Sequence, residues 1–334
     1  MNRQRHMIVW LTCLFMISCG RGSGEVQTEM RLQEYVSHLA LPGEQGRVSG
    51  TLEEAEAANY ITDQFIMMGL SPFGDEGTYL QQFVLRGAEA EEMGVDNHLS
   101  RNVAGVITGS VYPERFVIVG ARYDGPGGSS RHTMHEDNSR RPHYSGEDLV
   151  SGAAGLLWLA EQYARETPEV SIIFVAFSGN EQGLKGSSYF INQTEIERDS
   201  ILAMVNIGEI GHLQENRMTI SGMESSPHWD RLLSSLGSDT LTTVTPAPVV
   251  NRSDYFTFLS AGLPALNYTT ALFDEPDRDS NEEWPESEDE DDKGLNYGGM
   301  TTVLNHIKGV IDKIGRADPE ELSFTDRNIS PDSA

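Results

Sequence analysis

Short runs of largely apolar residues limit the fold of this chain more than any other sequence feature. Residues 116–119 read Phe-Val-Ile-Val, and residues 170–177, 201–207 and 264–269 form similar runs. A strand patterned in this way is buried on both faces, which is typical of parallel sheets covered by helices. Amphipathic stretches separate the runs and predict crossover connections between the strands. The chain is therefore predicted to be an α/β protein, a three-layer αβα sandwich with a mostly parallel central sheet.

Capping residues and periodicity predict the remaining elements. Thr51 and Glu54 form a capping-box start for a helix that ends before Gly69. Further helices are expected at residues 25–41, 150–164 and 300–314, and further strands at residues 79–85, 102–108 and 115–120. One domain is expected over residues 28–315, followed by a polar tail at residues 316–334.

The N-terminus has the features of an export signal. Two arginines precede an apolar stretch of eleven residues, 7–17, which is too short to cross a bilayer but suits a secretory signal. The stretch runs into Ser-Cys-Gly at Cys19, which resembles a bacterial lipoprotein signal. This resemblance implies a signal peptide at residues 1–18, then a lipidated Cys19 and a tether up to residue 27. The protein is then expected in the cell envelope, anchored to a bacterial membrane and facing the periplasm or exterior; the alternative is an ordinary signal peptide with an incidental cysteine.

Charge and cysteine content exclude other classes of protein. The sequence has 51 acidic and 24 basic residues and a formal net charge of −27. A field of that sign repels phosphate backbones, so no nucleic-acid partner is expected. Both cysteines, Cys13 and Cys19, lie in the N-terminal segment, so no internal disulfide is expected in the folded domain. Twelve acids fall within residues 274–292; this acidic insertion is interpreted as a solvated segment, with a weak calcium site as the alternative.

Several segments at predicted strand ends match a known family in order. They are Gly120-Ala121-Arg122-Tyr123-Asp124, Gly-Glu-Asp-Leu-Val-Ser-Gly at residues 146–152, and residues 174–187 with Ser178-Gly179-Asn180-Glu181. Together they resemble the signature segments of metallopeptidase family 28, whose members are two-zinc aminopeptidases, carboxypeptidases and their relatives. The resemblance covers residues 28–315 and implies a zinc-exopeptidase-like fold.

The resemblance also implies five zinc-ligand positions, and only one keeps its usual residue. Arg122 takes the place of the first histidine, and its guanidinium has no lone pair for a metal. Glu147 replaces the bridging aspartate, and Glu181 is the unchanged terminal carboxylate. Gly208 takes the place of the second terminal aspartate, and Asp274 that of the last histidine. No complete binuclear centre is therefore expected.

The general base is also replaced. Asn180 stands where the family has a glutamate, and an amide does not accept a proton near neutral pH. We hypothesise that the Arg122 guanidinium takes the place of zinc by neutralising the remaining acids with forked hydrogen bonds; the alternative is that Arg122 faces solvent at the end of its strand. Glu209 is expected to point away because it follows Gly208 along a strand. The pocket candidates are Arg122, Asp124, Glu147, Asp148, Asn180, Glu181, Glu209, Tyr255 and Asp274.

A polar connection at residues 126–144 offers an alternative metal site. It contains His132, His135, Glu136, Asp137 and His143. Histidines on such a connection are more often solvated than metal-bound, but these could contribute nitrogen ligands to a displaced single-zinc site together with Glu147 and Glu181.

These observations predict a lipid-anchored family member that binds a peptide or protein partner and has lost hydrolytic activity. No cofactor is expected in that case, with zinc as the alternative. Two competing hypotheses stay open: an active zinc exopeptidase with a rearranged metal site, and a cyclotransferase-like relative that uses one zinc ion.

Overall fold

The structure, a computed structural model, describes residues 20–40, 47–85, 99–125, 146–236, 243–247, 253–270 and 294–325. Only the backbone is described for residues 20–23, 146–148 and 243–247. The predicted signal peptide, the connection at residues 126–144 and the acidic insertion lie outside these residues.

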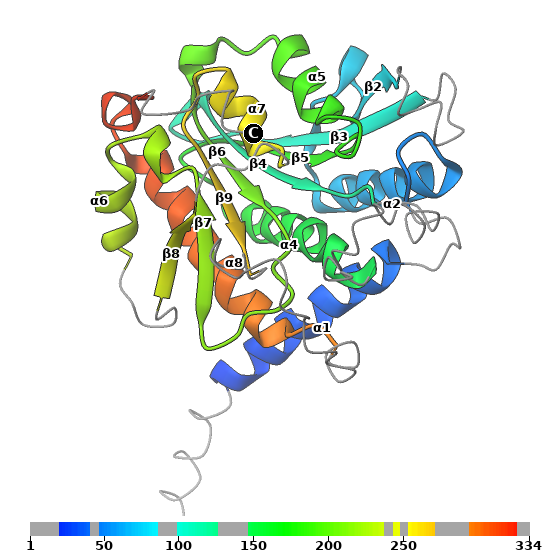
Figure 1. The fold of residues 1–334 in the computed structure, drawn as a ribbon, viewed down its shortest axis with the longest axis horizontal. Coiled ribbons are helices and arrows are strands. Elements are labelled where there is room, and N and C mark those ends of the chain that lie inside the picture. Colours follow the sequence, from blue (N-terminus) through cyan, green and yellow to red (C-terminus); the bar gives the residue numbers. More distant parts are fainter. Residues whose placement is uncertain are drawn as a thin grey trace, which may run out of the picture.

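The described strands form one mixed sheet (Figure 1). They are β1 (Ser71–Pro72), β2 (Leu80–Val84), β3 (Leu99–Ile107), β4 (Tyr112–Arg122), β5 (Val170–Phe177), β6 (Ile201–Ile207), β7 (Arg217–Ser221), β8 (Thr243–Ala247) and β9 (Ala265–Thr269). Their order is β1-β3-β5-β4-β6-β9-β7-β8, with β2 also paired to β3. The central strands β5, β4, β6 and β9 are parallel to one another, while β3 and β7 flank them in antiparallel pairing.

Helices cover both faces of this sheet, which confirms the predicted α/β class and the three layers. The helices are α1 (Gly20–Leu39), α2 (Leu52–Met68), α4 (Gly146–Arg165), α5 (Lys185–Gln193), α6 (Trp229–Ser234), α7 (Tyr255–Ser260) and α8 (Tyr297–Arg316). The described residues also include the short 3₁₀ turns η1 (Asp75–Gly77), η3 (Arg198–Ser200), η4 (Met223–Ser225) and η5 (Pro319–Leu322).

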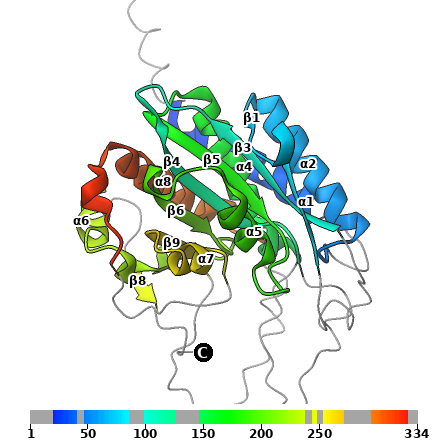
Figure 2. The same ribbon diagram turned by 90° about the horizontal axis from the view of Figure 1, so that it is seen from above.

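Two apolar clusters separate the layers. The larger packs α1, α2, α4 and α8 against one face through side chains such as Phe65, Trp158 and Leu304. The smaller packs α5 and α7 against the other face through Phe190 and Phe258. Figure 2 shows α5 and α7 on the side of the sheet opposite to α1 and α2. Strands β5 and β6 are buried along their whole length, as their apolar sequences predict.

The predicted ends of α2 are confirmed, but the predicted capping box is not formed. Thr51 accepts a hydrogen bond from the Glu54 amide at 3.3 Å, and Gly69 closes the helix with a left-handed φ of 78°. The Glu54 carboxylate turns inward instead of completing a capping box with Thr51: its Oε2 accepts from the Gly50 amide and its Oε1 from the Arg101 amide.

Both ends of the predicted domain differ from expectation. Helix α1 begins at Gly20, so most of the predicted tether at residues 19–27 is helical. A helix gains one backbone hydrogen bond for each residue added, so it can extend past its packed half, which contains the buried Leu32 and Tyr35. At the other end, residues 317–325 are packed and do not begin a frayed tail, because Leu322 is only 3% exposed and the Thr325 amide donates to Ser225. Within the described ranges, no helix has the length and apolarity needed to cross a membrane.

Candidate functional site

The carboxyl ends of β4, β5 and β6 meet at one edge of the sheet. Arg122, the last residue of β4, pairs with Phe177, the last residue of β5. The preceding residue, Ala121, pairs with Ile207 at the end of β6. Ligand sites of open α/β sheets lie at this edge because the residues after parallel strands converge there. The edge collects the predicted candidates Arg122, Asp124, Asn180, Glu181 and Glu209.

Arg122 is held among carboxylates. Its side chain is 15% exposed; its Nη2 donates a 3.1 Å hydrogen bond to Glu181 Oε1, and its Nε lies 3.3 Å from Asp124 Oδ1. Burial lowers the pKa of Arg122, but the charges of Asp124, Glu181 and Glu209 raise it above its usual value. The guanidinium is therefore a permanent cation that faces acids on more than one side.

Asp124 and Asn180 are fixed by the same set of hydrogen bonds. Asp124 is fully buried. Its Oδ2 accepts a hydrogen bond from Ser49 Oγ at 2.8 Å and another from the backbone N–H of Asn180 at 3.0 Å. The Asn180 side chain donates from Nδ2 to Asp254 Oδ2 at 3.4 Å. The residue at the family's general-base position thus acts as a hydrogen-bond donor.

Asp254 is a buried acid that the sequence did not single out. It is 1% exposed, and its Oδ1 has no hydrogen-bond partner within the described residues. Burial, together with the negative charge of Asp124, raises the pKa of Asp254 to about 6. The positive charge of Arg122 and hydrogen bonds from Ser187 and Asn180 oppose this shift. Nothing local in the sequence marked this aspartate as buried.

A second buried hydrogen-bond network holds the residues that follow β4. The Tyr123 hydroxyl lies 2.6 Å from Glu54 Oε1 and 2.6 Å from the Arg101 carbonyl. Burial raises the pKa of Glu54, although hydrogen bonds from Tyr123 and Ser100 and the charge of Arg101 oppose the shift. The Tyr123 hydroxyl is the donor in both contacts, so its one proton is shared between the Glu54 carboxylate and the Arg101 carbonyl. Arg47 also donates to the Tyr123 carbonyl at 2.9 Å, so the backbone between Arg122 and Asp124 is firmly held.

Two of the predicted candidates need correction. Strand β6 ends at Ile207, so Glu209 does not continue its alternation, and the negative charge of Glu209 contributes to the raised pKa of Arg122. Tyr255 lies in the smaller apolar cluster and has no exposed surface, so its side chain is not open to a ligand.

The structure describes the other family ligand positions to different extents. The Gly208 amide donates to the Tyr268 carbonyl at 2.8 Å, and a Cβ added at Gly208 would lie 3.0 Å from that carbonyl oxygen. Glu147 and Asp148 lie in the first turn of α4, where only the backbone is described. Asp274 and the candidate residues His132, His135, Glu136, Asp137 and His143 lie outside the described residues.

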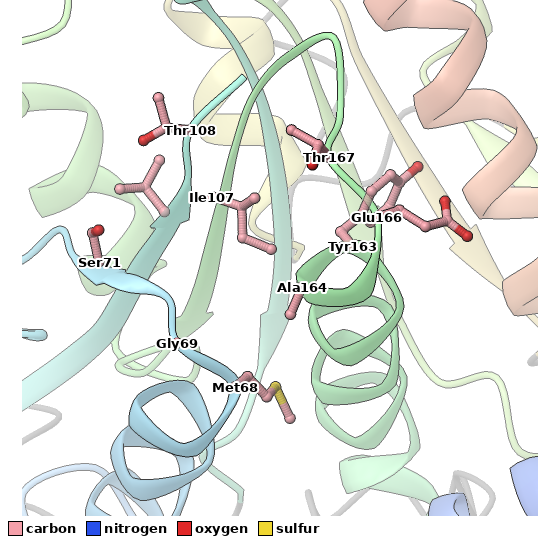
Figure 3. A pocket seen from close by; sticks show the side chains of 10 residues that line it. Met68, Gly69, Ser71, Ile107, Thr108, Tyr163, Ala164, Glu166 and Thr167 are labelled. Atoms are coloured by element: carbon pink, nitrogen blue, oxygen red, sulfur yellow. The ribbon is translucent and has the colours of Figure 1, made fainter. Parts of the chain in front are cut away.

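The described part of the chain does not fit a binuclear zinc centre. It contains no group of three or more histidine, cysteine, aspartate or glutamate side chains arranged to hold a metal ion. The Arg122 guanidinium, which stands at a ligand position, has only N–H donors to offer. A separate pocket of about 290 Å³ lies at the opposite end of the sheet, where β3 and α4 end, and includes Met68, Tyr163 and Thr167 (Figure 3).

Comparison with solved structures defines the class of fold as that of the zinc exopeptidases. A zinc aminopeptidase from Bacillus subtilis, BSAP, superposes with a TM-score of 0.63 at 14% identity, over 88% of this chain and 97% of the other. A glutaminyl cyclase from Bacteroides thetaiotaomicron, solved with N-acetylhistamine, superposes with a TM-score of 0.61 at 15% identity, over 86% of this chain and 97% of the other. At such identities the likeness shows the shared fold alone.

Sequence comparison then gives the family. The family model of peptidase family M28 matches residues 102–310, and the chain belongs to this family. A probable zinc metalloprotease from Pyrenophora tritici-repentis is 27% identical over 244 residues, which span 61% of this chain and 52% of that protein. Another, from Pyrenophora teres f. teres, is 32% identical over 115 residues, or 33% of this chain and 22% of that protein. The chain thus spans about half, or less, of the relatives that it matches.

Proposed function

We propose that this member of peptidase family M28 binds a peptide or protein partner and does not hydrolyse peptide bonds. The observation that carries the proposal is the Arg122 guanidinium, paired with Asp124 and Glu181 at the position of a family zinc ligand. A cation that cannot coordinate metal, seated among the acids, opposes the approach of a dication by charge repulsion.

The hydrogen bonding of Asn180 also supports the proposed loss of hydrolysis. A hydrolytic site needs a group that removes a proton from water, and Asn180 is already engaged as a donor to Asp254. Loss of a general base alone lowers a rate by roughly 10² to 10⁴, and loss of both metals removes the activated nucleophile and the polarisation of the scissile carbonyl as well. Zinc, if bound, would supply those two effects, but the described side chains do not form its ligand set.

Zinc content and peptidase activity test this proposal together. The chain from residue 19 onward is purified without chelator, and one portion is incubated with zinc. Elemental analysis is expected to give near zero zinc per chain in both portions, and neither is expected to hydrolyse aminoacyl-p-nitroanilides or dipeptides above the buffer rate. BSAP serves as the positive control. One or two tightly held zinc ions with chelator-sensitive hydrolysis would establish the active-exopeptidase alternative; one zinc ion with cyclisation of N-terminal glutamine would establish the cyclotransferase-like alternative.

We also propose that the protein is anchored through Cys19 to a bacterial membrane and faces the periplasm or exterior, where its partner would be met. The support is the Ser-Cys-Gly sequence after the apolar stretch at residues 7–17. In a bacterial host, the wild type and Cys13→Ser are expected to incorporate an alkyne fatty acid, and Cys19→Ser is not. Equal labelling of both variants, or no labelling of the wild type, would refute the anchor. Cys13 is a matched control because it is the other cysteine of the N-terminal segment and lies within the predicted signal peptide, before the lipidated position.

A further inference from the structure

A pocket at the amino-terminal edge of the sheet lies away from Arg122 and the other family positions. Ile107, the last residue of β3, lines it and pairs with Ile172 near the start of β5, so the pocket lies where the parallel strands begin. Its volume is about 290 Å³, at the lower limit of small-molecule sites, which range from roughly 300 to 1,000 Å³. This amino-edge pocket has room for one long side chain of a partner.

Apolar walls and hydroxyl groups form the lining of the amino-edge pocket. Met68 of α2 and Ile107 of β3 project into the space between the elements, and Ala164 faces them from α4 (Figure 3). Thr108 and Thr167 add hydroxyl groups to the lining. A lining of this kind suits a side chain with an aliphatic stem and a polar head, because the stem is removed from water while the head keeps its hydrogen bonds.

Exposed apolar side chains adjoin the amino-edge pocket on two of its sides. Met67, beside Met68 in the last turn of α2, is 68% exposed. Val111 and Tyr112 are 54% and 39% exposed, and their amides donate to the Glu169 carbonyl, which holds them next to the connection between α4 and β5. Exposed apolar groups around a cavity are typical of surfaces that a partner covers.

The charges at the amino-edge pocket favour a cationic ligand. Among the described lining residues, Glu166 is the charged one. Lys308 donates to Glu166 at 2.8 Å and to Asp312 at 3.2 Å, so one cation serves two acids and the cluster keeps one net negative charge. The side chain of Glu166 is 59% exposed, so a second cation can reach its carboxylate.

Two helices add to this negative potential because both end at the pocket. Helix α2 ends at Met68 and α4 at Arg165, and the carboxyl end of a helix carries a partial negative charge. The last turn of α2 contains no basic residue, and Arg165 in the last turn of α4 is paired with Glu161 at 2.6 Å. The formal net charge of −27 also attracts a positively charged partner from a distance.

We propose that the amino-edge pocket binds a lysine or arginine side chain of a peptide or protein partner, and that apolar neighbours of this residue cover Met67, Val111 and Tyr112. The aliphatic stem packs against Met68, and the charged head pairs with Glu166. This docking mode rests on the proposed function, since both require a bound partner. It adds where the partner docks, at the edge of the sheet opposite to the family's site, and which side chain the partner presents.

Blocked tripeptides test the pocket without a free peptide terminus. Acetyl-Leu-Lys-Leu-amide is titrated into the chain from residue 19 onward, whose methionine methyl groups are isotopically labelled for NMR, and acetyl-Leu-Gln-Leu-amide is the neutral comparison. The methyl signals of Met67 and Met68 should shift with the lysine peptide, and that of Met300, which is fully buried in the larger apolar cluster, should not. The lysine peptide should bind at least about tenfold more tightly than the glutamine peptide, because its ammonium can pair with Glu166.

Three variants of the chain locate the binding. Glu166→Gln removes one charge at nearly constant shape and should weaken the lysine peptide about three- to tenfold, with the glutamine peptide unchanged. Thr108→Lys adds a cation at an exposed position of the lining and should abolish the methionine shifts. Gln193→Lys is the matched control, because it adds the same charge at an exposed position at the end of α5, on the other face of the sheet, and should bind like the wild type. The Tm of all three should stay within about 2 °C of the wild-type value, which separates lost binding from unfolding.

Each opposite result would overturn this docking mode. Equal affinity for the two peptides would refute the cationic partner. Shifts that persist in Thr108→Lys, or that omit Met67 and Met68, would place the peptide elsewhere and leave the proposed function standing. No shift with either peptide up to about 10 mM would refute the pocket. The proposed function fails by a different result, which is zinc uptake with hydrolysis of unblocked dipeptides.

Discussion

Replacement of Asp254 by asparagine should stabilise the protein above pH 6 and reduce the dependence of its stability on pH. Asp254 is 1% exposed, and one of its carboxylate oxygens has no hydrogen-bond partner within the described residues. Its ionised form is therefore poorly solvated, and Asp124 adds a like charge nearby. Asparagine has nearly the same shape, carries no charge and can still accept the hydrogen bond from Asn180.

The size of the effect follows from the shift in pKa. The pKa of Asp254 rises from 3.8 to about 6 on folding, and each unit corresponds to about 1.4 kcal/mol, so ionisation costs the folded state about 3 kcal/mol. The folded state binds the proton more tightly than the unfolded state, so the wild type loses stability as pH rises from about 4 to above 6. The amide of asparagine needs an acceptor of its own, which reduces the expected gain at pH 8 to roughly 1–3 kcal/mol.

Urea unfolding between pH 4 and pH 8 measures this effect. The free energy of unfolding of the wild type minus that of Asp254→Asn should be near zero or positive at pH 4 and should become negative above pH 6. Asp63→Asn is the control, since Asp63 is exposed on α2, and its difference from the wild type should stay within about 0.5 kcal/mol. A difference for Asp254→Asn that is constant across this range would refute the inferred burial of charge.

Two further predictions concern the packing of the site edge. A Cβ at Gly152 would lie 2.5 Å from the Gly208 carbonyl oxygen. Gly152→Ala should therefore lose about 3 kcal/mol of unfolding free energy, measured in urea. The control is Gly24→Ala, which lies in open space on α1 and should lose none. Tyr123→Phe removes the hydroxyl that contacts Glu54 at 2.6 Å and should lose about 1–3 kcal/mol in the same assay; an unchanged value would show that Glu54 finds another partner.

The layers of the fold could be predicted from the sequence because a strand that is buried on both faces consists of an almost uninterrupted run of apolar residues. The runs at residues 170–177 and 201–207 coincide with β5 and β6, and both are buried throughout. Caps are also local, so Thr51 and Gly69 correctly mark the ends of α2. The ends of the domain were less predictable, since the burial of Leu322 depends on packing against distant elements.

The site could be predicted as a set of positions but not as an arrangement of contacts. The family segments bring Arg122, Asp124, Asn180 and Glu181 together, and each of these lies at the predicted edge of the sheet. The direction of Glu209 depends on where β6 ends, which alternation along a strand does not show. The role of Ser49, from a turn before α2, follows only from its 2.8 Å contact with Asp124.

Charge explains why the substitutions at the family's site positions belong together. With histidine, aspartate and glutamate at the usual places, the site is strongly negative and requires two dications. Arginine at position 122 adds one positive charge, glycine at 208 and asparagine at 180 each remove one negative charge, and aspartate at 274 adds one back. The net change is two units of charge toward neutrality. The positive charge that Arg122 contributes lies beside the buried Asp124. The same changes thus reduce the negative charge that a metal would otherwise offset at this edge of the sheet.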